Sequence, residues 1–260
     1  KNTKRTKIVC TLGPASEKEE VLTALIENGL NVTRMNFSHG SHEEHKGRMD
    51  LVKKVREKLN KPVALLLDTK GPEIRTGNFD QPEVLLEEGQ KFTITMKDVI
   101  GTKEICTVSY KGLANDVVAG DTILIDDGLV GLRVEEVNGD DILCIVENSG
   151  IVKNHKGVNV PGVKINLPAL TDKDISDIEF GISQGIDFIA ASFVRKVSDV
   201  LAIREVLERN NATDIQIISK IENQEGVDNL DDIVAVSDGI MVARGDLGVE
   251  IPTEEIPVVQ

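Results

Sequence analysis

The chain has 260 residues, enough for one large domain or two smaller ones. Its net charge of −14 and the lack of a Lys/Arg cluster large enough for a basic patch argue against nucleic acid as a partner. Aromatic residues are only 3% of the chain, so the core must be built from aliphatic side chains, as in buried parallel strands. No signal peptide or membrane-length apolar run is visible, so we expect a cytoplasmic protein without a membrane partner.

The first 70 residues alternate apolar runs with segments of helical period. Ser16 with Glu19, and Ser41 with Glu44, have the spacing of capping boxes that open two helices. Strands are predicted over residues 7–12, 30–35 and 63–67. This order predicts the start of a parallel sheet with helical crossovers.

The pattern changes from about Arg75 to about Lys164, where short β-like runs replace long amphipathic helices. Asn138-Gly139, between two such runs, is a strong hairpin signal. We therefore predict an inserted small β-barrel domain over residues 75–164. Residues 1–74 and 165–260 would then form the two parts of the β/α domain.

The alternation resumes after Pro168, where Thr171 and Ser198 are expected to open two helices and a third lies near 226–236. Strands are predicted over residues 187–194, 215–219 and 239–243. Cys10, Cys106 and Cys144 are far apart and have apolar neighbours, which indicates buried thiols in strands and a reducing compartment.

Six β/α units fit either a doubly wound open sheet or a (β/α)8 barrel. A doubly wound sheet concentrates its site at one switch point, whereas a barrel gathers all the strand ends on one face. Here nearly every strand ends in polar groups: Thr11; Arg34, Asn36 and Ser38; Asp68 and Thr69; Ser192 and Arg195; Lys220 and Glu222; Arg244 and Asp246. We therefore predict an α/β fold, a TIM-type barrel truncated after about six units.

Lys220 and Glu222 are two apart just past an apolar strand, so their side chains are expected to point the same way. Asp246 ends the next unit and could lie beside Glu222. Two carboxylates and a lysine suit Mg²⁺ or Mn²⁺ bridging substrate oxygens. The alternative is a surface salt bridge between Lys220 and Glu222.

Three other segments offer polar groups at predicted strand ends or turns. In the first, Arg34 can hold a carboxylate or phosphate, and Asn36 and Ser38 offer oxygens to a cation; a half-buried strand before a capped helix is the alternative. The second segment supplies Asp68, Thr69 and Arg75 as candidate ligand-binding residues; the alternative is that this segment is only a hinge. The third could deliver Lys156 to an anionic ligand, or be a solvated loop. His39, His42 and His45 do not share one helical face, so we do not expect a histidine metal site.

Several motifs together resemble the pyruvate kinase family, in the family's order along the whole chain. They are KIVCTLGPAS (7–16), NFSHG (36–40), LDTKGPEIR (67–75), KGVN (156–159), KIEN (220–223) and MVARGDLGVE (241–250). The resemblance implies transfer of a phosphoryl group from phosphoenolpyruvate to ADP, giving pyruvate and ATP in glycolysis. It also implies a β lid that closes over the site, and a homotetramer in the full-length protein.

The resemblance also implies residue roles. Lys220 would be catalytic, stabilising the moving phosphoryl group, and would bind substrate with Arg34, Gly245 and Asp246. Nucleotide would be bound by Asn36, Phe37, Ser38, His39, Arg75 and Lys156. Mg²⁺ or Mn²⁺ would be held by Glu222 and Asp246, and K⁺ by Asn36, Ser38, Asp68 and Thr69. Glu73 matches the potassium-dependent members of the family.

The departure from the family pattern is at the end of the chain, where members continue past Gln260 with two more strands and a regulatory domain. We therefore expect this chain alone to be inactive or nearly so. Two other readings stay open: a Mg²⁺-dependent lyase or aldolase-type barrel acting on pyruvate enolates, and a non-catalytic fragment that binds ligands.

Overall fold

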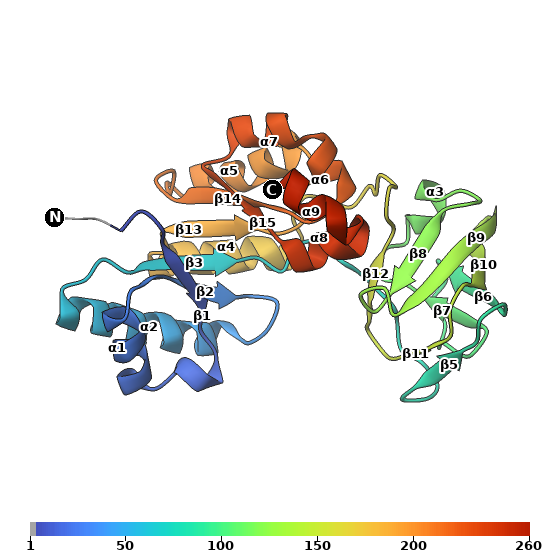
Figure 1. Cartoon of the computed structure of the whole chain (residues 1–260), viewed down its shortest axis with the longest axis horizontal. Helices are drawn as coiled ribbons and strands as arrows, with labels where there is room; N and C mark the ends of the chain where they lie inside the picture. Colours follow the sequence, from blue (N-terminus) through green and yellow to red (C-terminus); the bar gives the residue numbers. More distant parts are fainter. Residues whose placement is uncertain (1–3) are drawn as a thin grey trace. The chain divides into compact units, whose positions relative to one another are not determined.

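The computed structural model describes residues 4–260 and divides into two compact units (Figure 1). The first unit is formed by residues up to Gly71, by Ala169–Lys220 and by Leu230–Met241. The second is formed by Pro72–Pro168, Ile221–Asn229 and Val242–Gln260. The chain therefore leaves the first unit after its third long strand and returns to it about a hundred residues later.

The first unit is built on a parallel sheet whose strand order follows the chain without reversal, β1-β2-β3-β13-β14-β15. The strands are β1 (Ile8–Thr11), β2 (Leu30–Asn36), β3 (Ala64–Asp68), β13 (Phe188–Ala191), β14 (Gln216–Ile221) and β15 (Gly239–Val242). A doubly wound sheet reverses its order at a switch point, and this sheet has none among the described strands. The order is that of a barrel wall.

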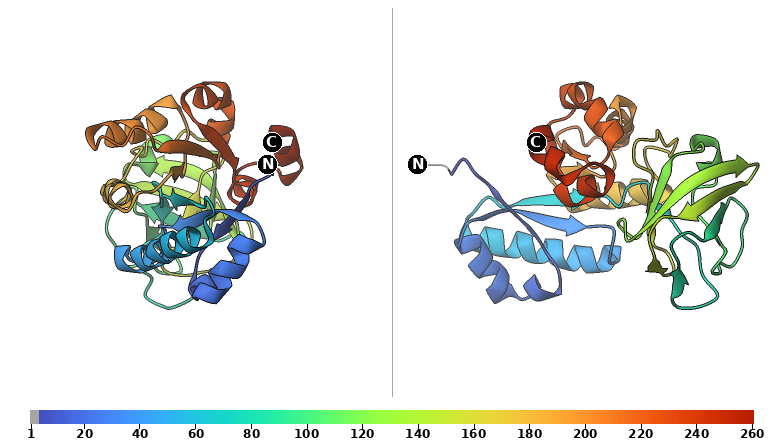
Figure 2. Two further views of the ribbon diagram at one scale, coloured as in Figure 1. Left: turned by 90° about the vertical axis from the view of Figure 1, so that its left-hand side faces the viewer. Right: turned by 45° about the vertical axis from the view of Figure 1, so that its right-hand side comes forward.

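The helices of this unit follow the same order. They are α1 (Glu19–Glu27), α2 (His42–Leu59), α4 (Asp172–Gln184), α5 (Val197–Arg209) and α7 (Leu230–Val236). α1 packs against α2, α2 against α4, α4 against α5, and α5 against α7, so the helices form one continuous layer. Figure 2 shows these helices, coloured from blue through orange, arranged around the curved sheet. Apolar residues of β3 and β13 are fully buried beneath this layer, among them Leu65, Leu67 and Ile189.

One predicted capping box, at Ser41, and one predicted helix start, at Thr171, are confirmed. Ser41 Oγ accepts from Glu44 N at 3.2 Å and opens α2, and Thr171 Oγ1 accepts from Asp174 N at 3.1 Å and opens α4. The prediction for Ser16 was wrong. Its hydroxyl accepts from Gly13 N at 3.0 Å within the 3₁₀ turn Pro14–Ser16, so α1 begins only at Glu19, after Lys18.

Two other helix predictions need correction. α5 begins at Val197, one residue before the expected Ser198, and Lys196 at its N-cap provides no side-chain hydrogen bond. The single helix expected near 226–236 is divided into α6 (Gln224–Asp228) and α7, with Asn229 between them.

The second unit contains a seven-stranded sheet of order β4-β12-β8-β9-β10-β6-β7 and the pair β11-β5. Its strands are β4 (Ile74–Arg75), β5 (Val84–Leu86), β6 (Lys91–Thr95), β7 (Ile105–Thr107), β8 (Thr122–Ile125), β9 (Val130–Asn138), β10 (Asp141–Val146), β11 (Gly150–Val152) and β12 (Gly157–Asn159). α3 (Leu113–Asp116) is the only α-helix described between Pro72 and Pro168. The predicted hairpin is confirmed, because Asn138 pairs with Asp141 and Gly139 turns with φ of 61°.

Alternate residues of these strands fill one apolar core, which includes Phe92, Ile94, Ile123, Leu132 and Ile142. The end of the chain adds α8 (Arg244–Glu250), the 3₁₀ turn Thr253–Glu255 and α9 (Ile256–Val259), which enclose a small cluster of Leu247, Ile251 and Ile256. Among residues 4–260, no helix combines the length and apolar character needed to cross a membrane.

Candidate functional site

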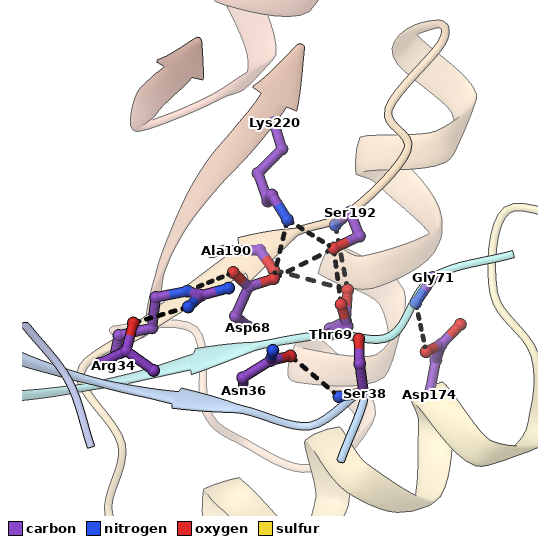
Figure 3. A network of polar contacts seen from close by, with 11 residues as sticks. Arg34, Asn36, Ser38, Asp68, Thr69, Gly71, Asp174, Ala190, Ser192 and Lys220 are labelled. Carbon is purple, nitrogen blue, oxygen red and sulfur yellow. Dashed lines mark hydrogen bonds and ion pairs between the residues drawn. The ribbon is translucent and has the colours of Figure 1, made fainter. Parts of the chain in front are cut away.

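Asp68 is the centre of a buried polar network at the carboxyl ends of the strands of the first unit (Figure 3). Its carboxylate is 1% exposed and accepts from Arg34 Nε at 2.6 Å, from Lys220 Nζ at 3.1 Å and from Ser192 Oγ at 3.1 Å. A buried carboxylate is costly without partners, and here two cations and a hydroxyl compensate it.

The parallel register of the sheet explains why these residues meet. Asn36 of β2 and Ala190 of β13 are both paired with Asp68 of β3, and Ala191 is paired with Ser219, the residue before Lys220. Strands with matched register present the residues after their last apolar positions at one edge. The predicted convergence of Arg34, Asp68 and Lys220 is therefore seen in the structure.

Ser192 bonds to several members of this network, although no role in the site was predicted for it from the sequence. Its hydroxyl also lies 2.6 Å from Thr69 O and accepts from Lys220 Nζ at 3.1 Å, while its backbone N–H donates to Thr69 Oγ1 at 3.0 Å. A Cβ on Gly71, whose φ is +74°, would lie 2.8 Å from the Ser192 Cβ. Glycine at 71 therefore permits the close approach that holds Ser192 beside Lys220.

Asp174 supports the turn after β3 from the first turn of α4. It is fully buried, and its carboxylate accepts from Gly71 N at 3.0 Å and from Thr171 N at 3.0 Å. The sequence predicted that Thr171 opens this helix, but it indicated neither of the two bonds to the Asp174 carboxylate. Thr11 was also missed as a partner, and its Oγ1 accepts from Arg34 NH1 at 2.7 Å.

Asn36, Phe37, Ser38 and His39 form the turn that joins β2 to α2. Phe37 N donates to Asp68 O at 3.0 Å, Ser38 N donates to Asn36 Oδ1 at 3.1 Å, and His39 N donates to Asn36 O at 3.3 Å. The side-chain oxygens of Asn36, Ser38, Asp68 and Thr69 thus come from two neighbouring strand ends (Figure 3). One carboxylate among neutral oxygens is a ligand set that suits a hard monovalent cation.

Glu222 and Asp246 belong to the second unit. Ala243 N donates to Ile221 O at 3.3 Å, which brings the segment before α8 next to the end of β14. Glu222, which follows Ile221, is 4% exposed, while Asp246 is exposed in the first turn of α8 one residue after Gly245. Within residues 4–260, no three His, Cys, Asp or Glu side chains are grouped closely enough to hold a metal on their own. Two carboxylates still fit Mg²⁺, which usually keeps several waters and takes substrate oxygens.

Arg75 and Lys156, the predicted nucleotide-binding cations, also lie in the second unit. Arg75 NH2 contacts Glu73 Oε2 at 2.6 Å, and Arg75 NH1 donates to His155 O at 2.7 Å. Lys156 Nζ lies 3.7 Å from Asp126 Oδ1. Gly157 is paired with Arg75 in the antiparallel register of β12 and β4, so Lys156 and Arg75 occupy the same end of this strand pair.

Lys220 is 8% exposed and Glu222 4% exposed, so neither belongs to the surface salt bridge that was the alternative reading. The network can hold an anion against two fixed cations, Arg34 and Lys220, whose positions are set by Asp68. Such preorganised charge is what phosphoryl transfer requires.

Comparison with known sequences agrees with this geometry. The sequence model of the family described as "Pyruvate kinase, barrel domain" matches residues 3–260. The chain belongs to this family. It is 60% identical to the pyruvate kinase of Clostridium acetobutylicum over 98% of its own length and 54% of that relative. It is 60% identical to the pyruvate kinase of Bacillus licheniformis and 58% identical to that of Staphylococcus epidermidis, each over 99% of this chain and 44% of the relative.

The chain thus spans about half the length of the pyruvate kinases it matches. Membership of this family confirms the resemblance read from the motifs, and with it a fold of the barrel type.

Proposed function

We propose that this chain carries the phosphoenolpyruvate site of a pyruvate kinase, which transfers the phosphoryl group to ADP and releases pyruvate and ATP. The observation that carries the proposal is the buried network in which Asp68 holds Arg34 and Lys220 at the carboxyl edge of a parallel sheet. Family membership supports the same chemistry.

In this proposal Arg34 binds the phosphate of the substrate, and Lys220 is the catalytic residue that faces the phosphoryl group as it moves. Glu222 and Asp246 would hold Mg²⁺ or Mn²⁺, which when bound neutralises charge on the substrate oxygens. Gly245 would receive the substrate carboxylate through its backbone. The enolpyruvate released is then protonated to pyruvate.

The oxygens of Asn36, Ser38, Asp68 and Thr69 would hold K⁺, and Glu73 fits the potassium-dependent members of the family. Asn36, Phe37, Ser38, His39, Arg75 and Lys156 would bind the phosphates of ADP. Residues 75–164 would act as a lid that excludes water when closed. A homotetrameric, cytoplasmic protein stays an expectation taken from the family.

A hybrid enzyme tests the proposal. The matching part of the Bacillus licheniformis pyruvate kinase would be replaced by this chain, to which it is 60% identical. We expect the hybrid to form pyruvate from phosphoenolpyruvate only with ADP, measured by a lactate-dehydrogenase-coupled assay, and Lys220→Met to lower kcat by at least about a hundredfold. ADP-independent pyruvate release would favour the lyase alternative, and an unchanged kcat in K220M would contradict the catalytic role.

The 260-residue chain alone should be nearly inactive. β1 and β15 are the two edges of the sheet within residues 4–260, whereas a closed barrel has eight strands and no edge. Turnover by the isolated chain close to that of the hybrid would contradict this expectation.

A further inference from the structure

Side chains from two helices, α2 and α4, contact the backbone of the turn at residues 37–39. These side chains have no part in the proposed ligand binding. His45 of α2 is 1% exposed, and its Nε2 lies 2.7 Å from His39 O. Since a carbonyl only accepts, this nitrogen carries the proton and donates. The other ring nitrogen, Nδ1, is buried and has no hydrogen-bond partner among the described residues. Burial lowers the pKa of His45, which agrees with a neutral ring.

The ring of His45 also supports the turn through its face. It stacks on Phe37 with ring centroids 4.1 Å apart and an interplanar angle of 16°. Gly40 follows the turn with φ of +80°, and a Cβ there would lie 3.2 Å from His45 Nε2. The imidazole therefore fills the space beneath residues 37–40, where its one N–H is directed at the backbone.

The second contact comes from α4. Lys173 Nζ donates to Phe37 O at 3.0 Å, and the same ammonium is paired with Asp177. Asp177 is 1% exposed and also lies 2.6 Å from His42 Nε2. His42 stacks on Phe180 with centroids 4.3 Å apart and makes none of the described bonds to the backbone of residues 37–39. The carboxylate of Asp177 thus orients the lysine toward the turn.

We propose that His45 and Lys173 are positioning residues that fix the carbonyls of His39 and Phe37, and thereby set the placement of the Asn36 and Ser38 oxygens for a monovalent cation. The inference rests on the proposed function, because that function assigns these oxygens to K⁺. His45 is expected to have the larger effect, since its side chain is buried, whereas the side chain of Lys173 is 46% exposed.

The test compares His45→Phe with His42→Phe. Both substitutions lie on α2, keep an aromatic ring and remove one imidazole hydrogen bond, but only His45→Phe removes a bond to the turn. Thallous ion serves as the probe for the K⁺ site, and its dissociation constant is measured by ²⁰⁵Tl NMR on the purified chain. Exchange of the Ser38 and His39 amides is measured in parallel, together with the thermal unfolding midpoint.

We expect His45→Phe to weaken thallous binding about fivefold and to speed exchange at Ser38 and His39 by a similar factor. The thermal unfolding midpoint should not change, because the stack on Phe37 remains and the buried, unpaired Nδ1 is removed. His42→Phe should leave both measurements within twofold of the wild type. Lys173→Met should give an effect between the two.

Equal thallous affinity and equal exchange rates in His45→Phe and the wild type would overturn the inference. A fall in the unfolding midpoint without a change in affinity would also overturn it, since that marks a merely structural role. If the wild-type chain binds no thallous ion, the cation site of the proposed function fails, and the exchange comparison between the two Phe variants still decides whether His45 fixes the turn.

Discussion

The candidate ligand-binding cations of the two units differ in how deeply they and their partner carboxylates are buried. In the first unit the side chains of Arg34 and Lys220 are 25% and 10% exposed and share one carboxylate that is 1% exposed. In the second unit Arg75 and Lys156 are 42% and 35% exposed, opposite the partly exposed carboxylates of Glu73 and Asp126. The first pair is fixed by a buried network, whereas solvent screens the second and leaves its side chains adaptable.

This difference suits different tasks. A cation that stabilises a moving phosphoryl group works best when it is already in place, because no reorganisation is then needed during the reaction. Cations that capture a nucleotide gain more from mobility, since they must exchange protein carboxylates for phosphate oxygens. We therefore expect Arg34 and Lys220 to serve the reaction, and Arg75 and Lys156 to bind the nucleotide.

The largest expected effect comes from removing the shared carboxylate. Asp68→Asn keeps the shape of the side chain but leaves Arg34 and Lys220 without their buried counter-charge. It should cost roughly 3–5 kcal/mol of unfolding free energy, measured by urea titration. Glu73→Gln is the matched change in the second unit and should cost less than about 1 kcal/mol. Equal losses in the two variants would remove the distinction between the units.

Thiol reactivity should separate the interiors of the two units. Burial raises the pKa of Cys106 and of Cys144, each to about 12, whereas Cys10 on the edge strand β1 is only half-buried. In native protein at pH 8, iodoacetamide should modify Cys10 more than about tenfold faster than the other two, since a lower thiolate fraction and burial both slow attack. Site-resolved mass spectrometry measures the rates, and comparable labelling of all three thiols would show that the core of the second unit opens readily.

A smaller effect is expected at Glu250 in α8. Burial raises the pKa of this carboxyl above its ordinary value of 4.5, although Asn159 Nδ2 donates to Oε1 at 2.8 Å. Folding therefore favours the protonated form, and its stabilising contribution is complete below pH 4.5 and is lost as pH rises through the folded-state value.

Glu250→Gln keeps the acceptor for Asn159 and removes the charge. The variant should match the wild type below pH 4.5 and be more stable above it, as followed by thermal unfolding at several pH values. Parallel curves for the two proteins across this range would show that the buried carboxyl carries no such cost. Glu250→Ala, which removes the acceptor as well, provides the control for the hydrogen bond.

The sequence predicted the strand and helix order well, because hydrophobic periodicity and capping boxes are local signals. The helix starts that were predicted wrongly also depend on local contacts. Ser16 has the capping spacing, but its hydroxyl is used by Gly13, so the next helix begins later. A competing partner one turn earlier cannot be recognised from spacing alone.

The site was predicted from the residues that follow apolar strands, and this rule brought Arg34, Asp68 and Lys220 together correctly. The rule placed Ser192 at a strand end but gave it no partner, and it left out Asp174, which lies in a helix and not at a strand end. The stack of His45 on Phe37 was missed although the two residues are close in sequence, because the rule considers strand ends and not the side chains of the following helix.

The proposed role of Lys220 requires that this side chain binds a phosphorylated substrate. Mn²⁺-enhanced water-proton relaxation, titrated with phosphoenolpyruvate, tests it directly on the purified protein. We expect phosphoenolpyruvate to change the relaxation of the wild-type complex. Lys220→Met should weaken this binding by at least about tenfold, and Lys53→Met on the outer helix α2 should not. Equal affinity for phosphoenolpyruvate in Lys220→Met and the wild type would rule out this role of Lys220.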